Sequence, residues 1–122
     1  MQGESDAEYS QESADSYLEN LKNLMALLRA ALRDENLPVV IGKINDSYMT
    51  PDGKPTQPFI EIVHSAQKEF TDMDKCASYV TEIESYEFSD DAWHYDTDGF
   101  IRMGIAFAKA VKKLESECLG IH

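Results

Sequence analysis

The chain has 122 residues, with 23 acidic side chains against 11 basic ones and a formal net charge of −12 at pH 7. Such a chain repels phosphate backbones and anionic lipid, so we expect no nucleic-acid or membrane partner. Its length suits a single domain over residues 1–122, and it contains no run of about 20 apolar residues that could cross a membrane. The polar, acidic start is unlike a secretion signal. This difference slightly favours a cytoplasmic location, and the cellular compartment stays open.

Hydrophobic periodicity predicts five elements in chain order. Residues 1–16 carry five acids and no base, and we expect them to form a solvated lead-in. From Tyr17 onward, apolar residues recur every three or four positions and predict a helix that ends near Arg33. The remaining elements are a buried strand within residues 37–44, a helix over 58–71, a strand over 77–83 and a last helix over 98–117. The inward faces that we expect are Ile62 or Val63, Ala66 and Phe70 on the middle helix, and Phe100, Gly104, Phe107, Val111 and Leu114 on the last.

The alternation of helices and strands predicts an α/β fold with parallel strands. Two parallel strands make a sheet narrower than independent stability usually requires, and its edges leave backbone groups unpaired. We therefore expect something to lie beside residues 39–44. It could be a second copy of the chain, another protein, or a part of the natural protein that this sequence lacks.

The sharpest chemical feature is an acidic loop before the last helix, in which Asp91 precedes His94 by three residues. In an open parallel sheet, this loop lies at the carboxyl edge, where ligands bind. The Asp91 carboxylate can accept the proton of one imidazole nitrogen and leave the other nitrogen free as a base. The competing interpretation is a capping loop, with Thr97 or Asp98 as the helix cap and His94 on the surface.

Other chemistries fit the residues less well. Residues 96–99 resemble the centre of a calcium loop, but alignment on the glycine puts non-acidic residues at the first and last ligand positions. The histidines lack zinc spacing, and we expect Cys76 and Cys118 each to be a small buried side chain. Ser5 mimics the serine of a Gly-x-Ser-x-Gly turn, but the strand that such a turn needs has no room before it. We therefore expect no metal and no other cofactor.

Several segments point to one family when they are taken together. They are Gln2-Gly3-Glu4-Ser5-Asp6-Ala7, Leu37-Pro38-Val39-Val40-Ile41, Ala66-Gln67 and Asp91-Ala92-Trp93-His94-Tyr95. From Gln2 to about Lys113, the chain resembles the sialate O-acetylesterase and acetylxylan-esterase-like carbohydrate esterases of the SGNH (GDSL-type) hydrolases. The resemblance implies a three-layer, flavodoxin-like α/β/α fold, of which this chain would hold the carboxyl-terminal half.

The resemblance also implies roles for individual residues. It makes Asp91 and His94 the catalytic pair and Gln2 a candidate oxyanion donor. Gly3 and Glu4 would shape or support the pocket. The family's nucleophilic serine lies upstream of the Gln-Gly-Glu motif, and nothing in this chain matches it.

The implied reaction is hydrolysis of acetyl esters on sugars, such as O-acetyl sialic acid or acetylxylan, by Ser-His-Asp acyl transfer. Because the serine-bearing half is absent, we expect the chain alone to be inactive or nearly so. Self-association, or pairing with the missing amino-terminal half, is the protein interaction that we expect. The alternative function is a non-catalytic acidic module for binding or assembly.

Overall fold

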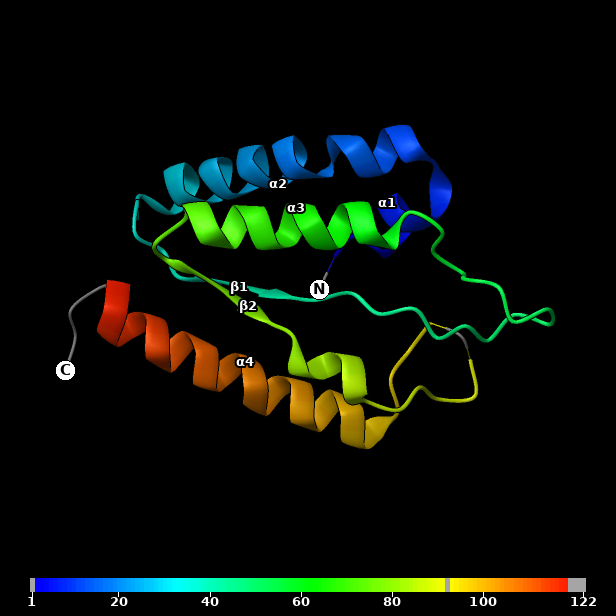
Figure 1. The fold of residues 1–122 in the computed structure, drawn as a ribbon. Helices are drawn as coiled ribbons and strands as arrows, with labels where there is room; N and C mark the ends of the chain where they lie inside the picture. The colour runs from blue at the N-terminus through cyan, green and yellow to red at the C-terminus, as the bar shows by residue number, and fades with distance from the viewer. Residues whose placement is uncertain (1, 92, 119–122) are drawn as a thin grey trace.

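The structure is a computed structural model that describes residues 2–91 and 93–118. Its elements are α1 (Glu4–Tyr9), α2 (Gln11–Leu32), β1 (Val39–Gly42), α3 (Ile60–Met73), β2 (Ala77–Val80), the 3-10 helix η1 (Glu82–Ser85) and α4 (Thr97–Cys118). Helices α2 and α3 lie on one side of the strands, and α4 lies on the other (Figure 1). Among the described helices, none is long and apolar enough to cross a membrane.

The two strands β1 and β2 pair in parallel, with Val39 opposite Ala77 and Gly42 opposite Val80. This pairing confirms the expected α/β class with parallel strands. Helix α3 makes the crossover between the strands that a parallel pair requires. The second strand is shorter than the predicted range of residues 77–83, because Glu82 and Ile83 lie in η1.

The amino end is helical and packed, which corrects the expected solvated lead-in over residues 1–16. Helix α1 and the first turns of α2 occupy this region, and α2 begins well before Tyr17. Ser10 caps α2, because its hydroxyl accepts a backbone N–H of the first turn at 3.1 Å. Ala7 and Ala14 are buried in the core. Their small side chains extend the apolar stripe upstream, but the acidic residues between them dominate the sequence pattern.

Two hydrophobic clusters join the elements, one on each face of the strand pair. The larger cluster lies between β1, α2 and α3 and includes Val63, Ala66 and Phe70, which confirms their expected inward position. The smaller cluster lies between β2, η1 and α4, around Ile83 and Ala106. Burial on both faces explains why β1 is a continuous apolar run.

Helix α4 turns a different face to the strands than its periodicity predicts. Phe100, Gly104 and Val111 are exposed, whereas the small Ala106 is buried. The Phe107 ring fills the space left free by the glycine at the end of β1. The expected inward stripe is therefore wrong at three of its positions. Helix α4 carries apolar residues on most of its faces, so its periodicity alone does not select the face that packs.

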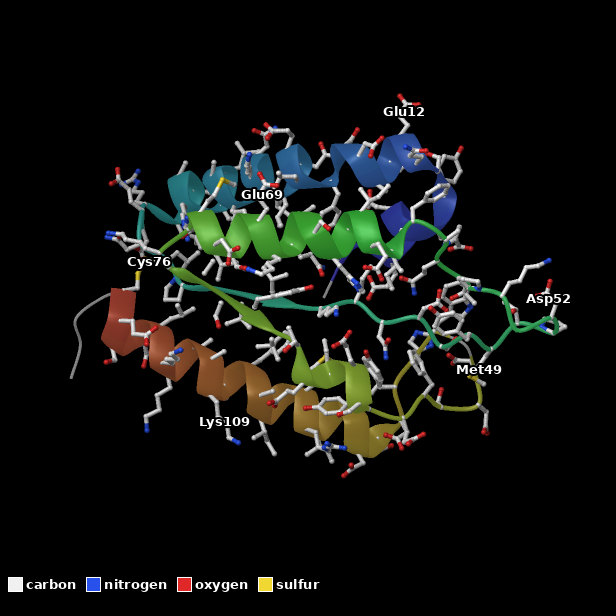
Figure 2. The ribbon with its side chains drawn as sticks, in the orientation of Figure 1. Glu12, Met49, Asp52, Glu69, Cys76 and Lys109 are labelled. Atoms are coloured by element: carbon white, nitrogen blue, oxygen red, sulfur yellow. A yellow bond between two sulfur atoms is a disulfide. The ribbon has the colours of Figure 1, made fainter. Side chains whose placement is uncertain are left out.

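Cys76 and Cys118 form a disulfide, with their Cα atoms 5.2 Å apart. The bond joins the start of β2 to the last residue of α4 (Figure 2). The expectation that each cysteine acts only as a small buried side chain is therefore wrong. The two residues are 42 positions apart in the sequence, and that spacing gives no sign of their proximity.

Candidate active site

The loop before α4 brings Asp91 and His94 into direct contact. The Nδ1 atom of His94 lies 2.9 Å from Oδ2 of Asp91 and 3.0 Å from Oδ1. Because a carboxylate only accepts hydrogen bonds, this contact places a proton on Nδ1 and leaves Nε2 free to act as a base. Ala92, between the two residues, lies outside the described part of the chain. The imidazole is thus oriented by its carboxylate neighbour, as the sequence spacing predicts, and its catalytic role stays a prediction.

Backbone donors hold the Asp91 carboxylate in its ionised form. Its Oδ1 atom accepts the N–H of Trp93 and the N–H of His94, each at 2.8 Å. The Trp93 amide and the His94 side chain are the main causes that lower the pKa of Asp91 to about 2. Both members of the pair are exposed, so a substrate could reach the imidazole without rearrangement of the described residues.

Packing and backbone bonds fix the loop that carries this pair. The chain folds back on itself through a bridge between Phe88 and Tyr95, whose rings stack with centroids 4.9 Å apart. The carbonyl of His94 accepts the N–H of Ser89 at 2.8 Å, so the histidine backbone is anchored from across the turn. The described residues on the two sides of Ala92 therefore pair like the arms of a hairpin, beside the buried Tyr95.

Asp96 caps the helix that follows the loop. Its carboxylate accepts the N–H of Gly99 at 2.7 Å. The sequence predicts Thr97 or Asp98 as the cap, and this prediction is wrong because both residues already lie within α4. Asp96 therefore caps the helix, whereas Asp91 bonds to the backbone and ring of His94.

The Gln-Gly-Glu segment is held rigidly at the amino end. The carbonyl of Gln2 accepts the Tyr17 hydroxyl at 2.9 Å and the Gln67 side-chain amide at 3.3 Å. Gly3 has φ 128°, and a Cβ at this position would lie 3.0 Å from side-chain atoms of Tyr17 and Val63. The segment therefore requires glycine both for its backbone angle and for its close packing.

The segment at the amino end and the histidine loop lie near each other despite their separation in sequence. Burial raises the pKa of Tyr95 to about 12, and the carboxylate of Glu4 adds to this rise. Glu4 begins α1, and Tyr95 directly follows His94. Folding therefore brings Glu4 of the first sequence anchor close enough to the second for its charge to raise the pKa of Tyr95. Gln2 is exposed, and its side chain makes no hydrogen bond within the described residues.

Gln67, for which the sequence pattern predicts no role, lies at the centre of a buried polar network. It is fully buried and donates to the carbonyls of Gln2 and Gly42 and to the Tyr17 hydroxyl. Its Oε1 atom accepts the Tyr79 hydroxyl at 3.3 Å. The available signal was a glutamine on the apolar stripe of α3, since a polar residue at a core position needs partners.

Two other candidates form no site within residues 2–91 and 93–118. Ser5 lies in the first turn of α1, is exposed, and makes no hydrogen bond to His94. Acidic, histidine and cysteine side chains form no group of three or more that could hold a metal ion within the same described ranges.

Comparison with known families identifies the lineage of the chain. A family model described as "Carbohydrate esterase, sialic acid-specific acetylesterase" matches residues 1–113. The chain belongs to this family. The match confirms the family that the sequence motifs resemble. No curated protein sequence matches the chain significantly.

A solved structure shares the fold. The X-ray structure of a protein from Arabidopsis thaliana at 1.6 Å resolution superposes with a TM-score of 0.74, at 22% sequence identity. The match covers 96% of the present chain and 42% of the Arabidopsis chain. The present chain thus spans less than half the length of that protein.

Proposed function

We propose that the chain supplies the Asp–His part of a serine-esterase site that removes acetyl groups from carbohydrates, such as O-acetyl sialic acid or acetylxylan. The observation that carries the proposal is the contact between Asp91 and Nδ1 of His94, which leaves Nε2 available as a general base. Membership in a carbohydrate esterase family supports the acetyl-ester substrate class. The nucleophilic serine is proposed to come from polypeptide outside these 122 residues, within a complete three-layer fold.

The proposed reaction is acyl transfer in two steps. The serine hydroxyl attacks the acetyl carbonyl while Nε2 of His94 takes the hydroxyl proton, and the sugar leaves after receiving that proton. Water then attacks the acyl-enzyme by the same proton path, which releases acetate and regenerates the serine. The Asp91 carboxylate stabilises the imidazolium in both steps.

The amino-terminal motif has a proposed supporting role in the same reaction. Gln2 and nearby backbone amides would donate hydrogen bonds to the oxyanion that forms on the acetyl carbonyl. Gly3 and Glu4 would shape the pocket. The bonds to the Gln2 carbonyl fix the backbone at this position, and a fixed backbone supports the proposed role of the nearby amides.

Nitrogen NMR on the purified chain tests the proposed base directly. We expect the neutral His94 ring to carry its proton on Nδ1, and we expect Asp91→Asn to weaken this preference. The ring of His64 is the matched control, because its Nε2 bonds to the carbonyl of Ile44 at 2.8 Å and it should not respond to Asp91→Asn. A His94 tautomer that is the same in both proteins would refute the proposed pair.

Hydrolysis of 4-nitrophenyl acetate tests the external nucleophile. We expect the chain alone to show only the slow reaction of an exposed imidazole, and we expect His94→Ala to remove it. The proposal would be wrong if the chain turned over the ester rapidly and lost this activity in Ser5→Ala, because the serine would then lie within the chain.

A further inference from the structure

The loop that follows β1 is closed by one buried carboxylate. Asp46, at the start of the loop, is 6% exposed and accepts three hydrogen bonds from Thr56 and Gln57 at its end, at 2.7 to 3.1 Å. A turn orders the tip, where the N–H of Gly53 donates to the Thr50 carbonyl at 3.0 Å. A loop whose ends are joined and whose tip is bonded keeps a fixed shape on the surface.

This fixed loop presents an aromatic ring to solvent. Tyr48 is 55% exposed, and its φ of 54° lies in the left-handed region, which an aromatic residue rarely adopts. Its N–H donates to Asp46 at 2.8 Å, and this bond holds the unusual backbone angle. Glycine or asparagine would make the same turn with less strain. Because the exposed ring fills no part of the core, the retained strain indicates that the ring contacts a ligand.

The histidine loop presents a second exposed ring. Trp93, the single tryptophan of the chain, is 48% exposed and directly precedes His94. Its N–H donates to Asp91 at 2.8 Å, so the carboxylate that orients the imidazole also fixes the backbone of Trp93. An indole held beside a candidate base is placed to contact the molecule on which that base acts.

The two loops leave the sheet at the same edge. Strands β1 and β2 are parallel, so the loops that follow them start at the carboxyl edge, where ligands of such sheets bind. The side-chain amide of Asn45 donates to the carbonyl of Glu84 at 3.2 Å, which ties the base of the first loop to η1, before the histidine loop. Figure 1 shows both loops extending from one end of the molecule. Tyr48 and Trp93 therefore lie at the end that carries His94.

The charge at this end disfavours an anionic ligand. Residues 84–98 contain no lysine or arginine and six acids, which are Glu84, Glu87, Asp90, Asp91, Asp96 and Asp98. On the first loop, the ammonium of Lys54 is paired with Asp52 at 2.7 Å. A carboxylated sugar would be repelled by this field, whereas a neutral sugar would not. A neutral pyranose also suits exposed aromatic rings, because its C–H face is apolar and its hydroxyls can bond the polar tips of tyrosine and tryptophan.

We propose that Tyr48 and Trp93 form a sugar-binding platform at the candidate active site, and that its ligand is a neutral saccharide chain stacked on the two rings. Of the two substrates considered above, the backbone of acetylxylan is neutral, whereas O-acetyl sialic acid carries a carboxylate. The proposal therefore departs from the sialic acid specificity in the description of the family, because of the acids around the histidine. It rests on the proposed function for the place of the site, but the binding that it predicts requires no hydrolysis.

Tryptophan fluorescence tests the platform, because Trp93 alone supplies the signal. Xylotetraose is titrated into the purified chain, and xylitol at the same hydroxyl concentration is the control without a sugar ring. We expect a saturable change with xylotetraose only, and we expect Tyr48→Ala to weaken binding about three- to tenfold through the loss of one stacked ring. The matched variant Tyr9→Ala removes a ring that is 84% exposed at the end of α1, and it should leave the affinity unchanged.

A second pair of probes tests the preference for neutral sugars. The methyl glycoside of N-acetylneuraminic acid is compared with its own methyl ester, which has the same rings and lacks the charge. We expect the ester to bind at least about threefold more tightly than the acid, because the acidic loop repels a carboxylate.

Three outcomes would overturn the proposal. An absence of saturable change with xylotetraose, or equal affinities of the parent chain and Tyr48→Ala, would show that these rings form no platform. Binding of the acid as tight as that of its ester would show that the site does not prefer neutral sugars. The tautomer of His94 and the hydrolysis of 4-nitrophenyl acetate are measured without a sugar, so the platform and the proposed Asp–His function can fail separately.

Discussion

Replacing Gln67 by methionine tests whether the buried polar network stabilises the fold. Methionine has nearly the same length and volume, so the change removes hydrogen bonds without opening a cavity. The Gln2 carbonyl keeps the Tyr17 hydroxyl as its partner, at 2.9 Å. The Tyr79 hydroxyl and the Gly42 carbonyl, however, each lose the hydrogen bond that Gln67 makes to them.

The expected loss of stability follows from these two groups, which are left without a hydrogen-bond partner. A polar group that loses its partner away from water costs about 1–3 kcal/mol, so we expect Gln67→Met to lower the free energy of unfolding by about 2–4 kcal/mol. Urea unfolding followed by circular dichroism measures this difference as a lower midpoint with an unchanged slope. The matched control is Lys68→Met on the same helix, whose side chain is 64% exposed, and it should change stability by less than about 0.5 kcal/mol.

A double substitution separates the network from simple packing. Adding Tyr79→Phe to Gln67→Met removes both partners of one hydrogen bond, so its cost should be smaller than the sum of the two single costs. The reasoning would be refuted if Gln67→Met and Lys68→Met were equally harmless, or if the two network changes simply added.

Three further changes probe other parts of the structure. Cys118→Ser opens the disulfide and should lower the free energy of unfolding by about 4 kcal/mol, from the entropy of a 42-residue loop; a reducing agent should destabilise the parent chain and leave the variant unaffected. The pKa of Asp91 is lowered from 3.8 to about 2, so its contribution to stability is present above about pH 4 and is lost as the pH falls through 2. Carbon NMR of its carboxyl group should show this midpoint, and His94→Ala should raise it only in part, because backbone amides remain; a midpoint near 4 in the parent chain would contradict the geometry. Gly3→Ala should lower the free energy of unfolding by about 1–3 kcal/mol, because Gly3 has a positive φ and is tightly packed. Gly104→Ala is the control and should not destabilise the chain, because the space around Gly104 is open. Thermal unfolding measures both variants, and a larger loss for Gly104→Ala than for Gly3→Ala would contradict this reasoning.

Much of the fold could be predicted because local patterns specify it. The inward residues Val63, Ala66 and Phe70 repeat at helical spacing, so α3 and its buried face follow from the sequence. The failures arise where the pattern is weak or ambiguous. Ala7 packs fully despite its acidic neighbours, and Phe100 is exposed because α4 offers more than one apolar face.

The candidate site divides in the same way. Asp91 and His94 are three residues apart, so one turn of loop brings them together, and short spacing makes the pair visible in the sequence. The role of Gln67 depends on Gln2 and on the end of β1, which are remote in the chain. No local pattern reports such a network.

The sequence by itself determined the family, the parallel α/β class and the Asp–His contact, because each depends on motifs or on periodicity within a few residues. Only the tertiary structure decided which face of α4 packs, that Cys76 meets Cys118, and that Gln67 joins Gln2 to the end of β1. These features depend on contacts between distant segments, and such contacts are set by the competition among many apolar surfaces for a small core.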